Sequence, residues 1–389
     1  MKNFNRVFVI IMDGTGCGVQ DDHDKYHKIE ANTLLSVYKT ANIFSLPNLE
    51  KMGLRHILFD EPLMSNAIAG KMRESTAGND TMAGVWEMFG IISYKRYLSS
   101  KTPLSDELTT EIERELGIQI VGNEYLSGFK ALDKFYVEHV EKKSPILYIS
   151  DDGIILLAAH EKVIQPDRLN SLGFNLSKIL KGKNIARVIT RPFLGNTGNF
   201  ERTVNRQDFL CDDKILSSPI LQSVKKRNFT FKTTEHLYKI LGQPVGVEFI
   251  KGNYNNHDLL KIIHAQINDV NETANFQLFC LQDFDMAGHK KDSISFAEYL
   301  KYFDTELLGL INKLKEDDLL IITADHGCDP KFPDRGHTRE FVPLLITFKN
   351  LIHGKSLGIR NSFADIGQTV CDIFKLPPLI HGQSFYETF

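Results

Sequence analysis

The sequence predicts an α/β fold in which a mostly parallel sheet is covered by helices on both faces. Two observations lead to this prediction. Short apolar runs bounded by turn residues recur along the chain, as expected of buried strands. Between several of them, apolar residues recur at three- and four-residue steps, as in helices that pack on a sheet. The strand-like runs are residues 7–12, 145–149, 276–281, 319–323 and 341–348.

Two helical patterns are clearest in the second half of the chain, where apolar residues recur at helical spacing over 296–314 and 363–373. The region 101–215 reads differently. It begins with a short helical pattern and continues with strand-like pieces around 149–158 and 186–193. The change of pattern indicates a separate α+β element within the chain.

Length and composition exclude several classes of protein. The chain has 389 residues, of which 42% are hydrophobic, and its net charge is -3. This length predicts two domains, or one large domain with an insertion. A slightly acidic chain has no basic field for nucleic acid, and no apolar run approaches the roughly 20 residues that span a bilayer. We expect neither nucleic acid nor a membrane as a partner.

The cysteines and the start of the chain indicate the compartment. Five widely spaced cysteines without a CxxC pair predict neither a disulfide framework nor a thiolate zinc site. Lys2 and Arg6 precede only six apolar residues, with no cleavage site, so we expect no export signal. A cytoplasmic location follows, since a reducing compartment suits free thiols.

Carboxylates and imidazoles gather just after three of the predicted strands. In an open parallel sheet, ligands bind beyond the carboxyl ends of the strands. The glycines after the first strand do not match a dinucleotide fingerprint. Aspartate and histidine are the donors that zinc, manganese or iron(II) take, and they meet if the strands are neighbours. The six donors are Asp13, Asp285, His289, Asp325, His326 and His337.

The number of donors indicates how many ions they hold. One catalytic ion with an open position usually takes three protein ligands, so six donors divide into two sets. Two ions about 4 Å apart can stabilise both the attacking and the leaving oxygen of an in-line phosphoryl displacement. The donors therefore predict phosphoryl or sulfuryl transfer at a two-metal site.

A nucleophile is expected in the loop 74–87, which is rich in hydroxyl groups and glycine and leads into a predicted helix around Trp86. A hydroxyl at a helix start lies beside free N–H groups that bind phosphate, and a metal can lower its pKa. Ser75, Thr76 and Thr81 fit equally well on these grounds. An ordinary helix N-cap is the alternative role.

A basic stretch lies in the middle region. Over 178–206, seven basic residues accompany a single acid, Glu201. A solvated surface is one interpretation, and an anion pocket near the Gly- and Asn-containing turns is the other. The basic residues are Lys178, Lys181, Lys183, Arg187, Arg191, Arg202 and Arg206.

Taken in order, the segments DGTGCG, NDTMAGVWE, DFDMAGH, TADHGCDP and GHTREFVPLL resemble the metal-dependent alkaline phosphatase superfamily. Within it, SDDGIILLAAHE and ARVITRPFLGNTGNFERTVNRQDF are similar to the phosphopentomutase family of nucleoside catabolism. The resemblance implies an alkaline-phosphatase-like core formed by 1–100 and 216–389, with a cap domain inserted at 101–215. It further implies that the cap binds the substrate phosphate.

The resemblance also implies roles for single residues. Thr81 would carry the phosphoryl group. Two divalent ions are implied, with manganese the usual metal and zinc or magnesium as alternatives. One would be held by Asp285, His289 and His337, and the other by Asp13, Asp325 and His326. The residues that would hold the pentose phosphate are Asp152, Arg191 and Arg206.

The chain departs from the family pattern at several positions. Asn79 and Glu248 stand where the family usually has lysine, and Val85 stands where it usually has histidine. The spacing between the acid and His289 is one residue shorter than usual. Cys328 replaces a common asparagine, and we expect a small buried thiol there. The changes near Thr81 bear on the substrate or the rate.

The family mechanism gives a specific expectation. Phospho-Thr81 donates its phosphoryl group to (deoxy)ribose 1-phosphate or 5-phosphate, and the resulting 1,5-bisphosphate returns its other phosphate to the enzyme, with a sugar bisphosphate as activator. A phosphatase, phosphodiesterase or sulfatase with the same core is the main alternative. A mutase for another sugar phosphate and a non-catalytic metal-binding protein are further alternatives.

Overall fold

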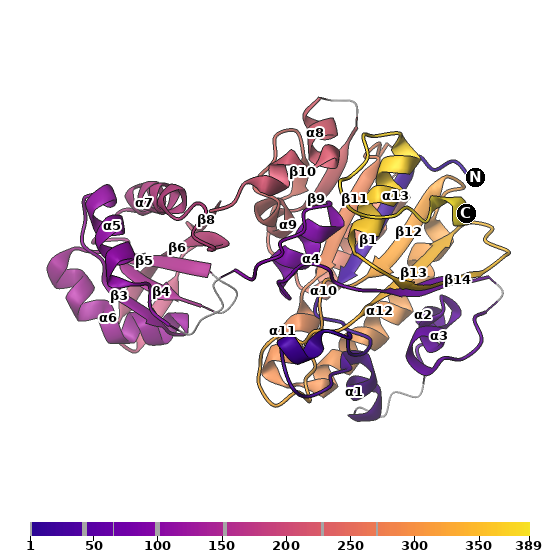
Figure 1. Cartoon of the computed structure of the whole chain (residues 1–389), viewed down its shortest axis with the longest axis horizontal. Coiled ribbons are helices and arrows are strands. Elements are labelled where there is room, and N and C mark those ends of the chain that lie inside the picture. Colours follow the sequence, from indigo (N-terminus) through magenta and orange to yellow (C-terminus); the bar gives the residue numbers. More distant parts are fainter. Residues whose placement is uncertain are drawn as a thin grey trace. The chain divides into compact units, whose positions relative to one another are not determined.

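The chain divides into two compact units. The core unit consists of Met1–Tyr94 and Lys214–Phe389, and the inserted unit consists of Lys95–Asp213 (Figure 1). The inserted unit begins six residues before the predicted start at 101 and ends two residues before the predicted end at 215. The computed structural model describes residues 2–40, 45–64, 66–97, 102–150, 154–226, 229–269 and 271–389.

The core unit is built on an eight-stranded sheet with the order β10-β9-β11-β1-β12-β13-β2-β14. The strands from β10 to β12 are parallel, β13 is antiparallel to both neighbours, and β14 is parallel to β2. The prediction of a mostly parallel sheet is therefore confirmed. The strands are β1 (Arg6–Met12), β2 (Ile68–Met72), β9 (Phe231–Thr234), β10 (Glu248–Ile250), β11 (Phe276–Leu281), β12 (Asp318–Thr323), β13 (Val342–Phe348) and β14 (Lys355–Arg360).

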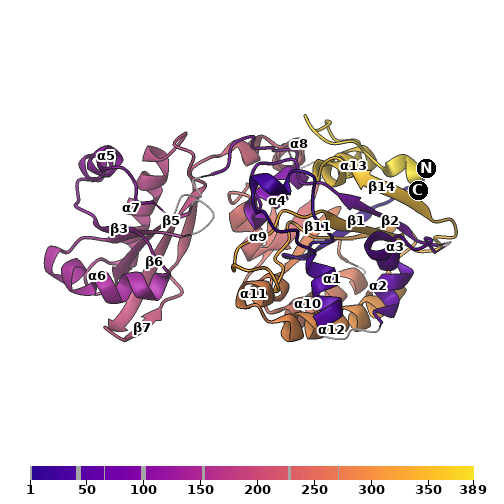
Figure 2. The same ribbon diagram turned by 60° about the horizontal axis from the view of Figure 1, so that its bottom comes forward.

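Helices cover both faces of this sheet, as predicted (Figure 2). On one face, six helices enclose the main apolar core with the side chains of β1, β11 and β12. They are α1 (Thr33–Thr40), α2 (Pro47–Lys51), α3 (Leu54–Phe59), α10 (Asn256–Asn268), α11 (Asp283–Lys290) and α12 (Ser293–Lys313). On the other face lie α4 (Thr81–Met88), α8 (Pro219–Lys225), α9 (Glu235–Ile240) and α13 (Ala364–Phe374).

Two-sided coverage explains the sequence of the central strands. All seven residues of β1 and all six of β11 and of β12 are buried, so each strand reads as a mostly apolar run rather than as a strict alternation of apolar and polar residues. No helix among the described residues is both long and apolar enough to cross a membrane. Short 3-10 helices occupy His23–Lys25, Lys214–Ser217 and Tyr386–Thr388.

The inserted unit has a sheet with the order β3-β4-β5-β6-β7, and β8 pairs with β6. Helices α5 and α7 share one apolar core with this sheet, and α6 contributes to another. The predicted run 145–149 is β4, and the predicted piece around 149–158 corresponds to β5, which is antiparallel to β4. The elements are α5 (Asp106–Leu116), β3 (Val121–Tyr125), α6 (Gly128–Lys142), β4 (Ile146–Ile149), β5 (Ile154–His160), α7 (Pro166–Ile179), β6 (Arg187–Asn196), β7 (Asn199–Arg202) and β8 (Gln207–Leu210).

Candidate active site

Three neighbouring parallel strands bring two of the predicted acids to one edge of the core sheet. The register pairs Met12, the end of β1, with Leu281, the end of β11, and β12 ends beside them. Asp13 follows β1 directly, and Asp325 lies two residues beyond β12. Both side chains are buried. The parallel arrangement thus places their carboxylates together, as the strand-end pattern predicted.

Asp285 and His289 reach the same edge from a helix. Asp285 lies in the first turn of α11 rather than directly at a strand end, and His289 follows four residues later. Residues four apart share one face of a helix. His289 Nε2 accordingly lies 3.3 Å from Asp285 Oδ2. The short spacing in this sequence is therefore one helical turn.

His337 completes this group from the loop between β12 and β13. Its Nε2 lies 3.1 Å from Nε2 of His289 and 3.6 Å from Oδ1 of Asp285. We call Asp285, His289 and His337 the helix donor set. Its three donors come from segments about fifty residues apart and converge within metal-coordinating range of one another.

The other three donors form a second group, which we call the strand donor set: Asp13, Asp325 and His326. His326 Nε2 lies 3.3 Å from Asp13 Oδ1 and 3.6 Å from Asp325 Oδ2. The N–H of Gly14, a residue with φ of +70°, donates to Asp325 Oδ1 at 3.1 Å. The structure therefore brings the six predicted donors together. Because Asp285 also lies within 4.8 Å of both His326 and His337, the division into two sets of three stays an implication of the family resemblance.

Thr81 is the first residue of α4, and its hydroxyl lies beside the strand donor set. Its Oγ1 is 3.4 Å from Asp13 Oδ1 and 3.3 Å from His326 Nε2. Asp80 caps the helix by accepting a hydrogen bond from the Ala83 N–H. A Cβ on Gly84 would lie 2.3 Å from the Asp325 carbonyl oxygen, so glycine allows α4 to approach this closely.

The other two candidate hydroxyls are used elsewhere. Ser75 Oγ donates to the Asn361 carbonyl at 2.6 Å, and Thr76 Oγ1 donates to the Ser93 carbonyl at 3.1 Å. These bonds hold the loop in place, so the tertiary structure distinguishes three hydroxyls that the sequence left equivalent.

Two buried carboxylate oxygens show that the site suits cations. Asp285 Oδ1 and Asp325 Oδ2 have no hydrogen-bond partner among the described residues. Each has only a histidine nitrogen 3.6 Å away. Leaving a buried carboxylate oxygen without a donor is costly unless a positive ion binds it. The donors are hard oxygens and imidazoles, which fit a divalent metal.

Burial and the close approach of charged groups also shift the pKa values of the donors. Burial and the neighbouring carboxylate of Asp325 raise the pKa of Asp13 to about 8. Burial and the charge on His326 lower the pKa of His337 to about 4. Burial alone would lower the pKa of His289, but its hydrogen bond to Asp285 raises it to about 9. Like charges crowd one another here, and divalent cations would relieve the repulsion between the acids.

Two cysteines adjoin the donor sets. Cys280 and Cys328 are both buried, in agreement with the expectation for Cys328. The Cys280 thiol donates to Asp13 Oδ2 at 3.2 Å, and the Cys328 thiol lies 3.7 Å from the Asp285 carbonyl oxygen. The sequence offered no signal for Cys280, because it stands inside an apolar strand.

The residues that depart from the family pattern occupy three different environments. Asn79 donates to the carbonyl oxygen of His337 at 3.3 Å. Val85 is fully buried in α4. Glu248 is exposed on the edge strand β10, 3.6 Å from Lys232 Nζ. Asn79 is thus hydrogen-bonded to a segment that carries a donor.

Basic side chains cluster in the inserted unit. Arg191 lies on β6, and its buried Nε has no hydrogen-bond partner among the described residues. Arg206 donates two hydrogen bonds to Asp208, both of 2.7 Å. Burial and the charges of Arg206 and Arg202 lower the pKa of Arg191 to about 10. The third predicted substrate residue, Asp152, lies outside the described residues.

The comparisons with known proteins agree with this geometry. The family model described as the Metalloenzyme superfamily matches residues 5–378. Phosphopentomutase of Caldanaerobacter subterraneus subsp. tengcongensis is 37% identical over 98% of this chain and 97% of that protein. The chain belongs to the phosphopentomutase family. The phosphopentomutase of Carboxydothermus hydrogenoformans is 36% identical, with 98% of each chain covered.

Membership in the phosphopentomutase family confirms the resemblance drawn from the motifs. The family and its metalloenzyme superfamily make the chain a phosphoryl-transferring mutase that uses divalent metal ions. Among solved structures, the alkaline phosphatase of the Antarctic bacterium TAB5 aligns with 97% of this chain and 99% of its own, with a TM-score of 0.38 and 15% identity.

Proposed function

We propose that the chain interconverts (deoxy)ribose 1-phosphate and (deoxy)ribose 5-phosphate, an isomerase reaction that proceeds through phosphorylated Thr81 and a 1,5-bisphosphate. One observation carries the proposal. The Thr81 hydroxyl lies within 3.4 Å of Asp13 and His326, at the start of a helix and beside two convergent donor sets.

The position of Thr81 suits a residue that carries a phosphoryl group. The first turn of a helix presents free N–H groups and the positive end of the helix dipole, both of which stabilise phosphate. His326 Nε2 lies 3.3 Å from the hydroxyl oxygen, so the hydroxyl faces the strand donor set, where a bound metal would lower its pKa. Asp80 holds the first turn of α4 by its cap, which keeps Thr81 in this position.

The strand donor set and the helix donor set would each hold one divalent ion, and manganese is our proposed metal. Bound there, the two ions would neutralise charge on the transferring phosphoryl group and on the oxygens that exchange it. Oxygen and imidazole donors accept manganese, and also zinc or magnesium, so metal content is part of the test.

The inserted unit would bind the phosphate of the pentose that is not transferred. Arg191 supports this role, because its buried Nε has no hydrogen-bond partner in the part of the chain that the structure describes and nearby arginines repel it, so an anion would relieve both conditions. Arg206 is held in place by Asp208, and its planar guanidinium suits a phosphate. We propose Asp152 as a third contact, to the sugar, from the family resemblance alone.

The five cysteines are all free and buried, which supports our proposal of a cytoplasmic location. No thiol pair that needs an oxidising compartment is formed among the described residues.

Phosphorus NMR of the manganese-loaded protein tests the reaction. With ribose 5-phosphate and a trace of ribose 1,5-bisphosphate as activator, we expect ribose 1-phosphate to accumulate to equilibrium. Release of inorganic phosphate alone would replace the mutase with a phosphatase. No reaction, together with Thr81 that never becomes phosphorylated, would favour a metal-binding protein without catalysis.

A further inference from the structure

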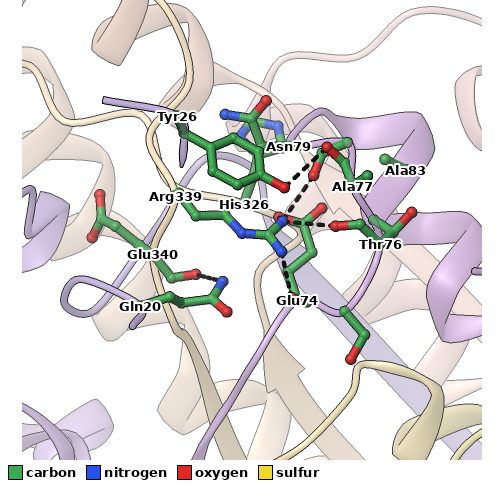
Figure 3. Close-up of polar contacts among 12 residues, drawn as sticks. Gln20, Tyr26, Glu74, Thr76, Ala77, Asn79, Ala83, His326, Arg339 and Glu340 are labelled. Atoms are coloured by element: carbon green, nitrogen blue, oxygen red, sulfur yellow. Dashed lines mark hydrogen bonds and ion pairs between the residues drawn. The ribbon is translucent and has the colours of Figure 1, made fainter. Parts of the chain in front are cut away.

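The loop Glu74–Asp80, which leads into Thr81, is held through its backbone carbonyl groups. A single side chain, Arg339, donates to the carbonyl oxygens of Glu74, Thr76 and Gly78 at 2.7, 2.9 and 2.9 Å (Figure 3). The carbonyl between them, on Ala77, accepts from the Tyr26 hydroxyl at 3.0 Å. We call this segment the nucleophile loop.

The opposite side of the nucleophile loop is held through its N–H groups. The buried carboxylate of Glu87 accepts from Ser75 N at 2.9 Å and from Thr76 N at 2.6 Å. The Ala77 N–H donates to the Ser93 carbonyl at 2.6 Å. Glu87 lies in α4, the helix that Thr81 begins, so this side ties the loop to its own helix.

Arg339 ties the same loop to a different segment. It stands two residues after His337, a member of the helix donor set, and its side chain is only 2% exposed. Its charge is paired with Glu74 at 2.8 Å and with Asp22 at 3.2 Å. The ring of Tyr26 lies 4.5 Å from the guanidinium carbon. The loop is therefore joined to the donor segment by contacts that only a buried, planar cation makes.

We propose that Arg339 is a positioning residue for phosphoryl transfer, which sets the nucleophile loop, and through it the Thr81 hydroxyl, relative to the donor sets. Its guanidinium nitrogens donate to Asp22 and to groups of the nucleophile loop. A lysine has one ammonium group and cannot reach three carbonyl oxygens and two carboxylates in a plane. Because misplacement of a reacting atom by about 1 Å can reduce a rate by about 100-fold, the effect on the rate should be large.

The chain offers a matched control. Arg6 is also buried, pairs with Asp318 at 2.6 Å, and donates to the backbone carbonyls of Gln266 and Ile267. It begins β1, whereas Asp13 follows the other end of that strand. Arg6→Lys replaces a buried, paired arginine in the same way as Arg339→Lys. It should therefore lower the stability of the fold without moving Thr81.

The experiment compares Arg339→Lys, Arg6→Lys and the wild type, each loaded with manganese. For Arg339→Lys we expect kcat to fall by about 100-fold, with KM for ribose 5-phosphate within about threefold of wild type and with two metals still bound. For Arg6→Lys we expect a lower unfolding midpoint and an unchanged kcat. Equal kcat values in the two variants, or metal loss that accounts for the fall, would overturn the proposal.

Hydrogen exchange provides a readout that does not depend on turnover. In Arg339→Lys, the amides of Ser75, Thr76 and Ala77 should exchange faster than in wild type, while Arg6→Lys leaves them protected. If Arg339→Lys does not fold, Tyr26→Phe removes one hydrogen bond from the same loop, and it should speed exchange there and lower kcat by severalfold. Unchanged exchange in every variant that alters the loop contacts would refute the positioning role.

The kinetic part rests on the proposed function, since kcat is measured for transfer through Thr81. The two failures are distinguishable. A wild type that forms no ribose 1-phosphate contradicts the proposed function, whereas an active wild type with an equally active Arg339→Lys variant contradicts only the role of Arg339.

Discussion

At the amino-terminal ends of β1 and β12, Arg6 donates to both carboxylate oxygens of Asp318, at 2.7 and 2.6 Å, and all of these groups are buried. At the carboxyl-terminal ends of the same two strands, Asp13 and Asp325 are equally buried, but the Asp325 Oδ2 has no hydrogen-bond partner among the described residues. The charges at the amino-terminal edge are therefore paired with each other, whereas at the carboxyl-terminal edge a carboxylate oxygen remains available to bind a ligand.

The difference teaches how one sheet separates stability from chemistry. A buried ion pair that is complete needs no ligand, and breaking it is costly because a charge is left unpaired. Buried acids that repel one another need a cation, and burial beside Asp325 raises the pKa of Asp13. The carboxyl-terminal edge therefore carries the reactive groups, while the ion pair at the amino-terminal edge contributes to the stability of the fold. The predictions below test this division, beginning with the largest expected effect.

Removal of the nucleophile should have the largest effect on the rate. We expect Thr81→Ala to lose about 10⁴-fold or more in kcat, because no other hydroxyl of the loop faces the donors. Phosphorus NMR of product formation measures the loss, and atomic emission of the purified variant should still show both metals. Ser75→Ala is the matched control: it removes one hydrogen bond that holds the loop but leaves the Thr81 hydroxyl, so kcat should fall by severalfold at most. A Thr81→Ala variant with near wild-type turnover would contradict the role of Thr81.

Neutralising one acid at the open edge should remove a metal. We expect Asp325→Asn to lose about 10³-fold in kcat and to bind the metal of the strand donor set much more weakly, because an amide is a poor ligand for a divalent ion. Metal titration by calorimetry measures the affinity. If both metals bind as tightly as in wild type, the assignment of Asp325 is wrong.

In the inserted unit, the buried Nε of Arg191 lacks a hydrogen-bond partner among the described residues. Arg191→Ala should raise KM for ribose 5-phosphate by about 100-fold, because a charged hydrogen bond to phosphate is lost. Steady-state kinetics measure this change. Lys178→Ala, on the same unit, is the control. An unchanged KM would mean that the arginine cluster is only structural.

The closed edge should respond in stability and not in rate. Asp318→Asn leaves Arg6 buried without its counter-charge, so we expect the free energy of unfolding to fall by about 3–5 kcal/mol. Urea unfolding measures this loss. The kcat of the folded fraction and the metal content should equal those of wild type. If the activity of each folded molecule fell together with the stability, the separation of stability and chemistry between the two edges would be wrong.

The smallest expected signal is proton release on metal binding. In the metal-free protein, the pKa of Asp13 is about 8, that of His289 is about 9, and the carboxylates around His326 raise its pKa as well, so all three carry a proton near pH 7. Metal binding should release roughly three protons at that pH and fewer as the pH rises past the values of Asp13 and His289. Calorimetry in buffers of different ionisation enthalpy measures the number. Heats that are independent of the buffer would contradict these shifts.

Sequence patterns were sufficient to predict the strands whose residues are buried on both faces of the sheet. The central strands are covered on both faces, so they appear as apolar runs, and β11 has the predicted bounds. The short or exposed strands escaped prediction, because β10 has three residues and β14 is largely exposed, which leaves no apolar run to recognise. The donors could be found because they follow strands closely in the sequence, although parallel strand ends place only Asp13 and Asp325 directly, and helix α11 and the loop before β13 bring in Asp285, His289 and His337.

By itself, then, the sequence determined the fold class, the family and the set of donor residues, since each is expressed in contiguous segments. Only the tertiary structure decided which of three hydroxyls faces the donors, that Cys280 contacts Asp13, and that Arg339 holds the nucleophile loop. These contacts join segments from 68 to 267 residues apart, and the geometry that selects among chemically similar side chains exists only when those segments are packed together.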